Sequence, residues 1–194
     1  MKKIQDHYFK EARKQGYVAR SAFKLEEMDR KFRLLRRGQH VIDLGCAPGS
    51  WLQYAAKKVL PEGSLTGVDL KQVKIQFPES VRIFQSDIYI LEESILASYR
   101  FDLVLSDMAP DTTGIPSVDS QRSYDLNSQA LSFAQRHLKP GGTLVLKAFQ
   151  GEPLNRLKSE IRPCFESFKL FKPKSSRSES VEIFVLGFGL LPQS

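Results

Sequence analysis

Apolar and polar residues follow each other along this chain in blocks that predict strands and helices in turn. Apolar runs of strand length are separated by segments of helical spacing or by short polar connections. The expected strands are residues 40–45, 64–70, 81–87, 101–107, 143–149, 167–172 and 181–190. The expected helices are residues 50–60, 90–99, 124–138 and 154–164. Alternation of this kind predicts a doubly wound, mostly parallel α/β sheet with helices on both faces.

The connections refine this expectation. Residues 108–120, with Pro110, Gly114 and Pro116, read as a loop, and Lys-Pro-Gly-Gly at 139–142 ends the helix before it. The last two strands leave no room for a helix between them. Because a parallel pair needs a crossover of about a dozen residues or more, this pair is expected to be antiparallel.

The first 37 residues differ from the rest, because basic and aromatic side chains are interleaved there. From Ser21, a plausible N-cap, the residues Ala22, Leu25, Met28 and Phe32 recur at helical spacing. We therefore expect residues 1–37 to form a basic arm and helix packed on a domain spanning residues 38–194, in a single-domain protein. Such an arm can contact phosphates and stack on bases.

Composition narrows the class of partner and the compartment. The chain has 194 residues and a formal net charge of +7, which favours a polyanionic partner such as RNA or DNA. Its two cysteines, Cys46 and Cys164, have no metal-like spacing and indicate a reducing compartment. Neither a signal-peptide pattern nor an apolar run long enough for a bilayer is present. We expect a cytoplasmic protein, or one of the mitochondrial matrix in a eukaryote.

Candidate chemistry begins at the turn after the first predicted strand. Asp43-Leu44-Gly45-Cys46-Ala47-Pro48-Gly49 joins a strand to a helix through small residues, which lets a ligand approach the backbone. Two later acids, Asp69 and Asp87, also come at strand ends. Since ligands of parallel α/β sheets bind beyond the carboxyl ends of the strands, the three acids are expected to line one crevice.

Three further charges occupy positions where a buried sheet should be apolar. Asp107 and Lys147 each follow an apolar strand, and Glu182 lies within the last one. A lysine held away from bulk water loses hydration of its charged form and can accept a proton near neutral pH. These residues therefore indicate a site that deprotonates an alcohol.

Five segments together resemble the FtsJ (RrmJ/RlmE) family of ribosomal RNA 2′-O-ribose methyltransferases. They are RSAFKL (20–25), DLGCAPGSW (43–51), SDMAP (106–110), LKAFQG (146–151) and KPKSSR (172–177). The resemblance extends in order over nearly the whole chain. It implies a Rossmann-like, S-adenosylmethionine-dependent methyltransferase fold with a seven-stranded mixed sheet.

The resemblance also implies roles for single residues. The family's catalytic lysines, aspartate and glutamate fall on Lys24, Asp107, Lys147 and Glu182, with Lys147 as general base. Contacts to S-adenosylmethionine fall on Gly49, Trp51, Asp69, Asp87 and Asp107. The implied substrate is a uridine ribose of large-subunit (23S-type) ribosomal RNA, free or in the ribosomal subunit, modified by a monomer without metal. RNA contacts are expected from Arg13 and Arg20 in the arm and from Lys174 and Arg177 in the last loop.

Some alternatives stay open. Ser50 stands where many members have glycine, and Asp111 where asparagine is common. A transfer RNA branch of the family shares the motifs. A non-catalytic RNA-binding factor of ribosome assembly would be expected to lack one of the four catalytic residue types. A nicotinamide oxidoreductase would need a full GxGxxG turn and would leave Lys147 and Glu182 unexplained.

Overall fold

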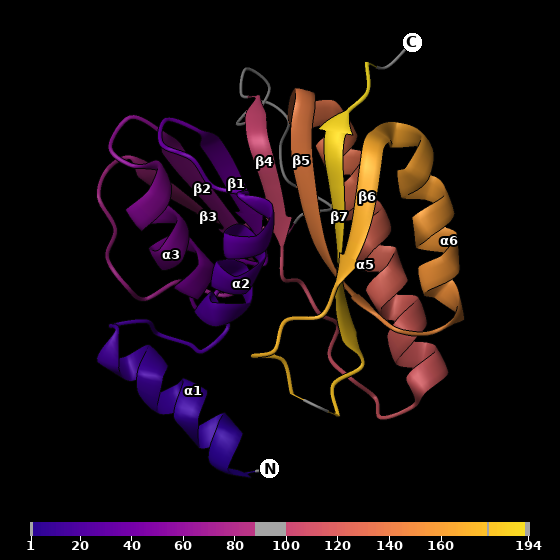
Figure 1. The fold of residues 1–194 in the computed structure, drawn as a ribbon, viewed down its shortest axis with the longest axis horizontal. Coiled ribbons are helices and arrows are strands. Elements are labelled where there is room, and N and C mark those ends of the chain that lie inside the picture. The colour runs from indigo at the N-terminus through magenta and orange to yellow at the C-terminus, as the bar shows by residue number, and fades with distance from the viewer. Residues whose placement is uncertain (1, 88–99, 178, 193–194) are drawn as a thin grey trace.

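The computed structural model describes residues 2–87, 100–177 and 179–192. Within them a seven-stranded mixed sheet forms the middle layer, and helices cover both of its faces (Figure 1). The strands are β1 (His40–Leu44), β2 (Ser64–Asp69), β3 (Val81–Gln85), β4 (Phe101–Ser106), β5 (Leu138–Phe149), β6 (Phe165–Phe171) and β7 (Glu182–Leu190). The helix expected at residues 90–99 lies outside the described residues.

The sheet has the order β3-β2-β1-β4-β5-β7-β6. Strands β1 to β5 pair in parallel with one another, whereas β7 is antiparallel to both β5 and β6. The expected mixed sheet and the antiparallel final pair are both confirmed. Because β1 pairs with β2 on one side and β4 on the other, the strand order reverses between β1 and β4, and a crevice opens there beyond the strand ends.

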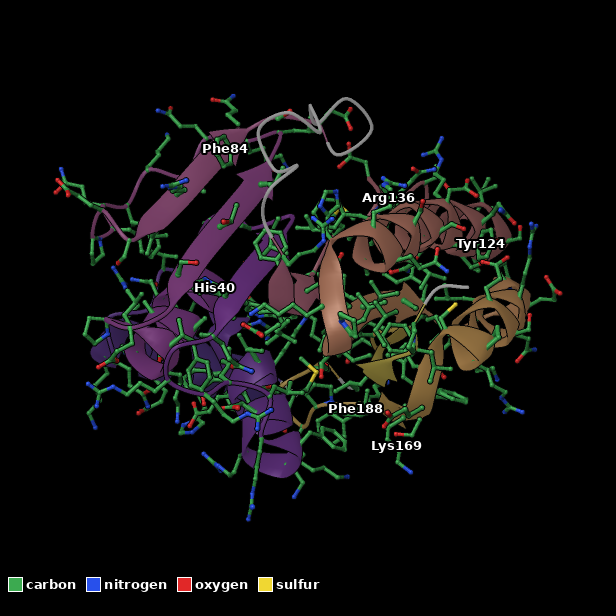
Figure 2. All side chains as sticks on the ribbon, turned by 90° about the horizontal axis from the view of Figure 1, so that it is seen from above. His40, Phe84, Tyr124, Arg136, Lys169 and Phe188 are labelled. Atoms are coloured by element: carbon green, nitrogen blue, oxygen red, sulfur yellow. The ribbon has the colours of Figure 1, made fainter. Side chains whose placement is uncertain are left out.

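The helices are α1 (Lys2–Lys14), α2 (Ala22–Phe32), α3 (Ser50–Val59), α5 (Pro116–His137) and α6 (Glu152–Ile161), with a 3₁₀ turn at Arg162–Cys164. Helices α2 and α3 pack with one face of the sheet, and α5 and α6 pack with the other. Among the side chains labelled in Figure 2, Tyr124 of α5 belongs to the core under α5 and α6, and Phe188 of β7 packs against the core under α2 and α3. Leucine and β-branched residues alternate between the two cores, so the central strands are apolar on both faces.

Helix α5 begins at Pro116, so the prediction of a loop through residue 120 and a helix start at Tyr124 is wrong. Proline suits the first turn of a helix because its fixed φ is already helical and no backbone N–H is needed there. The carboxylate of Asp119 accepts hydrogen bonds from the backbone N–H groups of Thr113 and Gly114 at 2.7 and 3.1 Å, which holds the chain entering the helix. Residues 116–123 are mostly polar, so the apolar spacing that indicates a helix is absent from this part of the sequence.

The N-terminal region also differs from the expectation. Residues 2–14 form a helix of their own, α1, which contacts α2 through the rings of Tyr8 and Phe23 at 5.5 Å between centroids. Ser21 does not cap α2 with its side chain; its hydroxyl shares a hydrogen bond of 2.7 Å with that of Ser50. Strands β5 and β6 begin at Leu138 and Phe165, earlier than predicted. No helix among the described residues is both long and apolar enough to cross a bilayer.

Candidate active site

A cavity of about 590 Å³ opens where the strand order reverses. Its wall is built from the ends of β1, β2 and β4, the residues after β3, and one side of α5. It is lined by Leu44, Gly45, Ala47, Val68, Asp69, Leu70, Lys71, Ser86, Asp87, Met108, Ala109, Pro110, Asp111, Arg122, Asp125 and Leu126. Gly45 has φ of 79°, and a Cβ there would lie 2.6 Å from Cγ of Met108. Only glycine fits this turn, so the backbone itself forms part of the cavity wall.

Two of the predicted strand-end acids lie on the cavity wall. Asp69 is held by two backbone N–H groups, from Ala47 at 2.8 Å and from Lys71 at 2.7 Å. These bonds fix the carboxylate at the end of β2 while its oxygens keep acceptor capacity for a ligand. Asp87, which follows β3, lies on the same wall. The crevice expected from the strand ends is therefore present with these two acids.

The third acid, Asp43, lies beneath the crevice and does not line it. Its side chain is fully buried in β1, and among the described residues neither of its oxygens has a hydrogen-bond partner. Burial raises the pKa of Asp43 well above its usual value, and Asp107 and Asp69 add to the rise, whereas Lys147 opposes it. The expectation that Asp43 lines the crevice is wrong, because the crevice begins at Leu44, the last residue of β1, which follows Asp43.

Gly49 and Trp51, predicted as cofactor contacts, are not part of the cavity lining. Gly49 immediately precedes α3 with φ of 109°. The Trp51 ring is buried against Phe184, with 5.9 Å between ring centroids, and its Nε1 donates to the backbone oxygen of Ser21 at 2.8 Å. Trp51 therefore ties the start of α3 to the start of α2.

Strand pairing brings three of the four predicted catalytic residues to one face of the sheet. Lys147 is opposite Phe184 in the pairing of β5 with β7, and Glu182 lies two residues before Phe184, on the same face. Asp107 directly follows β4, next to β5. The Nζ of Lys147 lies 3.0 Å from Oδ1 of Asp107 and also donates to the backbone oxygen of Asp107. The side chain of Lys147 is only 9% exposed, so this amine is largely shielded from bulk water.

The fourth residue, Lys24, reaches the same face from α2. Its Nζ lies 2.7 Å from Oε1 of Glu182 and 2.8 Å from Oε2, and both side chains are 12% exposed. Burial by itself would raise the pKa of Glu182, but the positive charges of Lys24 and Lys147 bring it below the usual value. Glu182 is therefore ionised and lies in the field of both lysines.

Two buried side chains of α5 hold the backbone around Lys147, and sequence reasoning missed both. Asn127 donates from Nδ2 to the backbone oxygen of Lys147 at 2.9 Å, and Ser123 accepts from the N–H of Phe149 at 3.1 Å. The pairing of β4 with β5 ends at Leu146, so these backbone groups need partners other than β4. Polar residues at buried positions of an amphipathic helix were the only signal that could have indicated them.

The predicted RNA contacts lie outside the cavity. Arg13 is exposed on α1, and Arg20 is half-buried between α1 and α2. Lys174 and Arg177 are exposed on the loop that follows β6. The chain continues from this loop to Glu182 of the lysine and carboxylate cluster.

The sheet order, the antiparallel β7 and the cavity at the β1–β4 switch define a Rossmann-like methyltransferase fold. The family model for FtsJ-like methyltransferases matches residues 17–190, and the chain belongs to this family.

Relatives and a solved structure agree with this membership. A protein of Desulfatibacillum aliphaticivorans named ribosomal RNA large subunit methyltransferase E is 46% identical over 186 residues, covering 95% of this chain and 90% of the relative. Its namesake from Oleidesulfovibrio alaskensis is 43% identical over 193 residues, covering 97% and 93%. A crystal structure described as a ribosomal RNA methyltransferase from Plasmodium falciparum has a TM-score of 0.80 and 28% identity, covering 91% of this chain and 100% of that one.

Proposed function

We propose that this protein transfers the methyl group of S-adenosylmethionine to the 2′-hydroxyl of a uridine in large-subunit ribosomal RNA. The observation that carries the proposal is the shielded Lys147–Asp107 pair beside the cavity. Met108, the residue after Asp107, is part of the cavity lining. The relatives named for ribosomal RNA methylation support the choice of substrate. Recognition of a 2′-hydroxyl also requires RNA, which agrees with the net charge of +7.

The residues at the cavity fit S-adenosylmethionine. A volume of about 590 Å³ suits a ligand of nucleoside size, and Asp69 and Asp87 offer acceptors for ribose hydroxyls and for the adenine amino group. The bare backbone at Gly45 allows close approach, and the nearby carboxylates favour a cation electrostatically. S-adenosylmethionine, when bound, supplies an electrophilic methyl group on a positively charged sulfur.

The chain's own residues then act on the ribose. Lys147, in its neutral form, would accept the proton of the 2′-hydroxyl and so free the ribose oxygen to take up the methyl group that S-adenosylmethionine would supply. Asp107 keeps the amine of Lys147 in place through its carboxylate and its backbone oxygen. Lys24 and Glu182 position the ribose. The negative charge of Glu182 also attracts the amine of Lys147.

All four side chains of this cluster come from one chain, so a monomer can carry out the reaction. We also infer a cytoplasmic location, because a ribosomal RNA substrate is met where ribosomes assemble.

The test compares the wild-type protein with Lys147→Ala and Lys147→Arg for transfer of labelled methyl groups to large ribosomal subunits, naked ribosomal RNA and transfer RNA. We expect transfer to ribosomal RNA or its subunit, and a loss of about 10²–10⁴-fold in kcat for both variants, since arginine does not give up its proton. Lys169→Ala, on the exposed edge strand β6, serves as the control and should match the wild type.

The outcomes separate the alternatives. Unchanged transfer by Lys147→Ala would exclude this lysine as the base. Transfer by the wild type to transfer RNA alone would assign the protein to the other branch of the family. Binding of ribosomal RNA without any transfer would support a non-catalytic assembly factor.

A further inference from the structure

One helix holds the loop after β6 at two points. The carboxylate of Glu27, on α2, accepts hydrogen bonds from two successive backbone N–H groups of that loop, Lys174 at 2.7 Å and Ser175 at 2.8 Å. These residues are 147 and 148 positions away along the chain. Since both bonds are made to an acidic side chain, they belong to the stronger class of hydrogen bonds.

The second point of attachment lies one helical turn earlier. Lys24 precedes Glu27 by three residues, so the two side chains share one side of α2. Lys24 pairs with Glu182, which follows the same loop. Thus Glu27 fixes the start of the loop, and Lys24 fixes its end.

The loop between these points is also closed on itself. The N–H of Ser176 bonds to the oxygen of Pro173 at 3.1 Å, and Nζ of Lys172 donates to the oxygen of Ser180 at 2.8 Å. Ser175 is 3% exposed, whereas the side chains of Lys174 and Arg177 are exposed. Fixing the backbone of this loop therefore also fixes the directions in which its basic side chains leave the surface.

We propose that Glu27 is a positioning residue that holds the loop after β6 in the conformation in which Lys174 and Arg177 contact RNA phosphates. The RNA part of this inference rests on the function proposed above. Glu27 touches neither the cavity nor the Lys147–Asp107 pair, so its effect is on RNA binding and not on the bond-breaking step.

The neighbouring acid provides a matched control. Glu26 carries the same charge one residue earlier, but its partner is Arg30 on the same helix, at 2.8 Å. We compare Glu27→Ala with Glu26→Ala, and Glu27→Gln as the conservative change that keeps one acceptor oxygen. Hydrogen exchange of the Lys174 and Ser175 amides, read by NMR, tests the anchor directly, and steady-state kinetics on ribosomal RNA or subunits test its consequence.

We expect the two amides to exchange at least about tenfold faster in Glu27→Ala than in Glu26→Ala, with Glu27→Gln between them. The KM for RNA should rise about tenfold in Glu27→Ala, while kcat and the KM for S-adenosylmethionine stay within about twofold of the control. Equal exchange in the Glu26 and Glu27 variants would overturn the proposal. So would a fall in kcat with an unchanged KM for RNA, or a loss of folding seen as a lower unfolding midpoint in Glu27→Gln.

The two proposals can fail separately. If the wild-type protein transfers no methyl group to ribosomal RNA, the proposed function fails, but the exchange comparison still decides whether Glu27 holds the loop. If transfer occurs and the two alanine variants have equal KM for RNA, the role of Glu27 fails while the function stands.

Discussion

At the scale of single residues, the site depends on charged groups that the sheet holds away from water. Lys147 and Glu182 are both buried or nearly so, and each has an oppositely charged partner within 3.0 Å. Such pairs satisfy the rule that a buried charge is costly unless it is paired. Asp43 is the exception, because among the described residues nothing donates a hydrogen bond to its carboxylate.

Asp43 should therefore destabilise the fold as pH rises. Its pKa is raised in the folded protein by burial and by Asp107, so between the ordinary pKa near 4 and the raised value the unfolded chain ionises more readily. Unfolding is then favoured progressively as pH increases. Asp43→Asn cannot ionise, and we expect it to be more stable than the wild type at pH 8 by about 1–3 kcal/mol, with the difference shrinking toward pH 4.

Urea unfolding of both proteins at pH 4, 6 and 8 measures this difference. Glu79→Gln, at an exposed position before β3, removes a carboxylate without relieving burial and is the control. A wild-type protein that gained stability over Asp43→Asn as pH rose would contradict the prediction.

The residues that sequence could indicate are those whose chemistry conflicts with their surroundings. Lys147, Asp107 and Glu182 stand out because they interrupt or end apolar strands. Lys24 does not stand out among the many basic residues of the first segment, and only the family resemblance indicated it. The role of Glu27 could not be predicted, and Asn127 had only a weak signal as a polar residue on the buried side of a helix, because both act on backbone groups that folding alone brings near.

At the scale of elements, the strands were easier to predict than the helix ends. A strand buried on both faces is a short apolar run, which is visible without knowing its neighbours. Helix α5 begins among polar residues, and its start depends on Pro116 and on the bonds that Asp119 makes. The strand order also could not be read from the pattern, because neighbours in the sheet need not be neighbours in sequence.

The amino ends of β1, β4 and β5 are joined by one carboxylate, and this junction can be tested. Asp102 accepts from the N–H of His40 at 2.8 Å and from Nζ of Lys139 at 2.7 Å. Burial would raise the pKa of Asp102, but these two partners bring it below the usual value. A lowered folded pKa means that the stabilisation is present above pH 4 and is lost as pH falls through the folded pKa.

We expect Asp102→Asn to lower the free energy of unfolding by about 1–3 kcal/mol at pH 7 and by less at pH 2. Urea midpoints at the two pH values provide the measurement. Glu62→Gln, which breaks an exposed pair with Arg37, should change stability much less. An undiminished difference at pH 2 would show that the ionised carboxylate is not the cause.

At the scale of the whole molecule, the directions of the strands bring the loop after β6 and Lys147 to the same end of the sheet. Strand β7 is antiparallel to both β5 and β6. Strand β6 therefore ends at the same end of the sheet at which β5 carries Lys147. The loop that follows β6 therefore lies at the same end of the sheet as the cavity, and the residues before β6 lie at the opposite end. The net charge of +7 favours a polyanionic partner without saying where it binds, whereas the proposed contacts of Lys174 and Arg177 put RNA at this end of the sheet.

The salt dependence of RNA binding tests whether Lys174 and Arg177 contact phosphates. Each phosphate contact with a single strand contributes about 0.7 to the slope of log Kd against log salt concentration, because binding releases condensed counterions. We expect Lys174→Gln and Arg177→Gln each to reduce that slope by about this amount, and the double variant by about twice as much. Arg162→Gln, which removes an exposed positive charge before β6 at the opposite end of the sheet, keeps the overall charge change the same. If the Arg162 variant reduced the slope as much as the others did, the effect would come from total charge, and the loop would have no special part in binding.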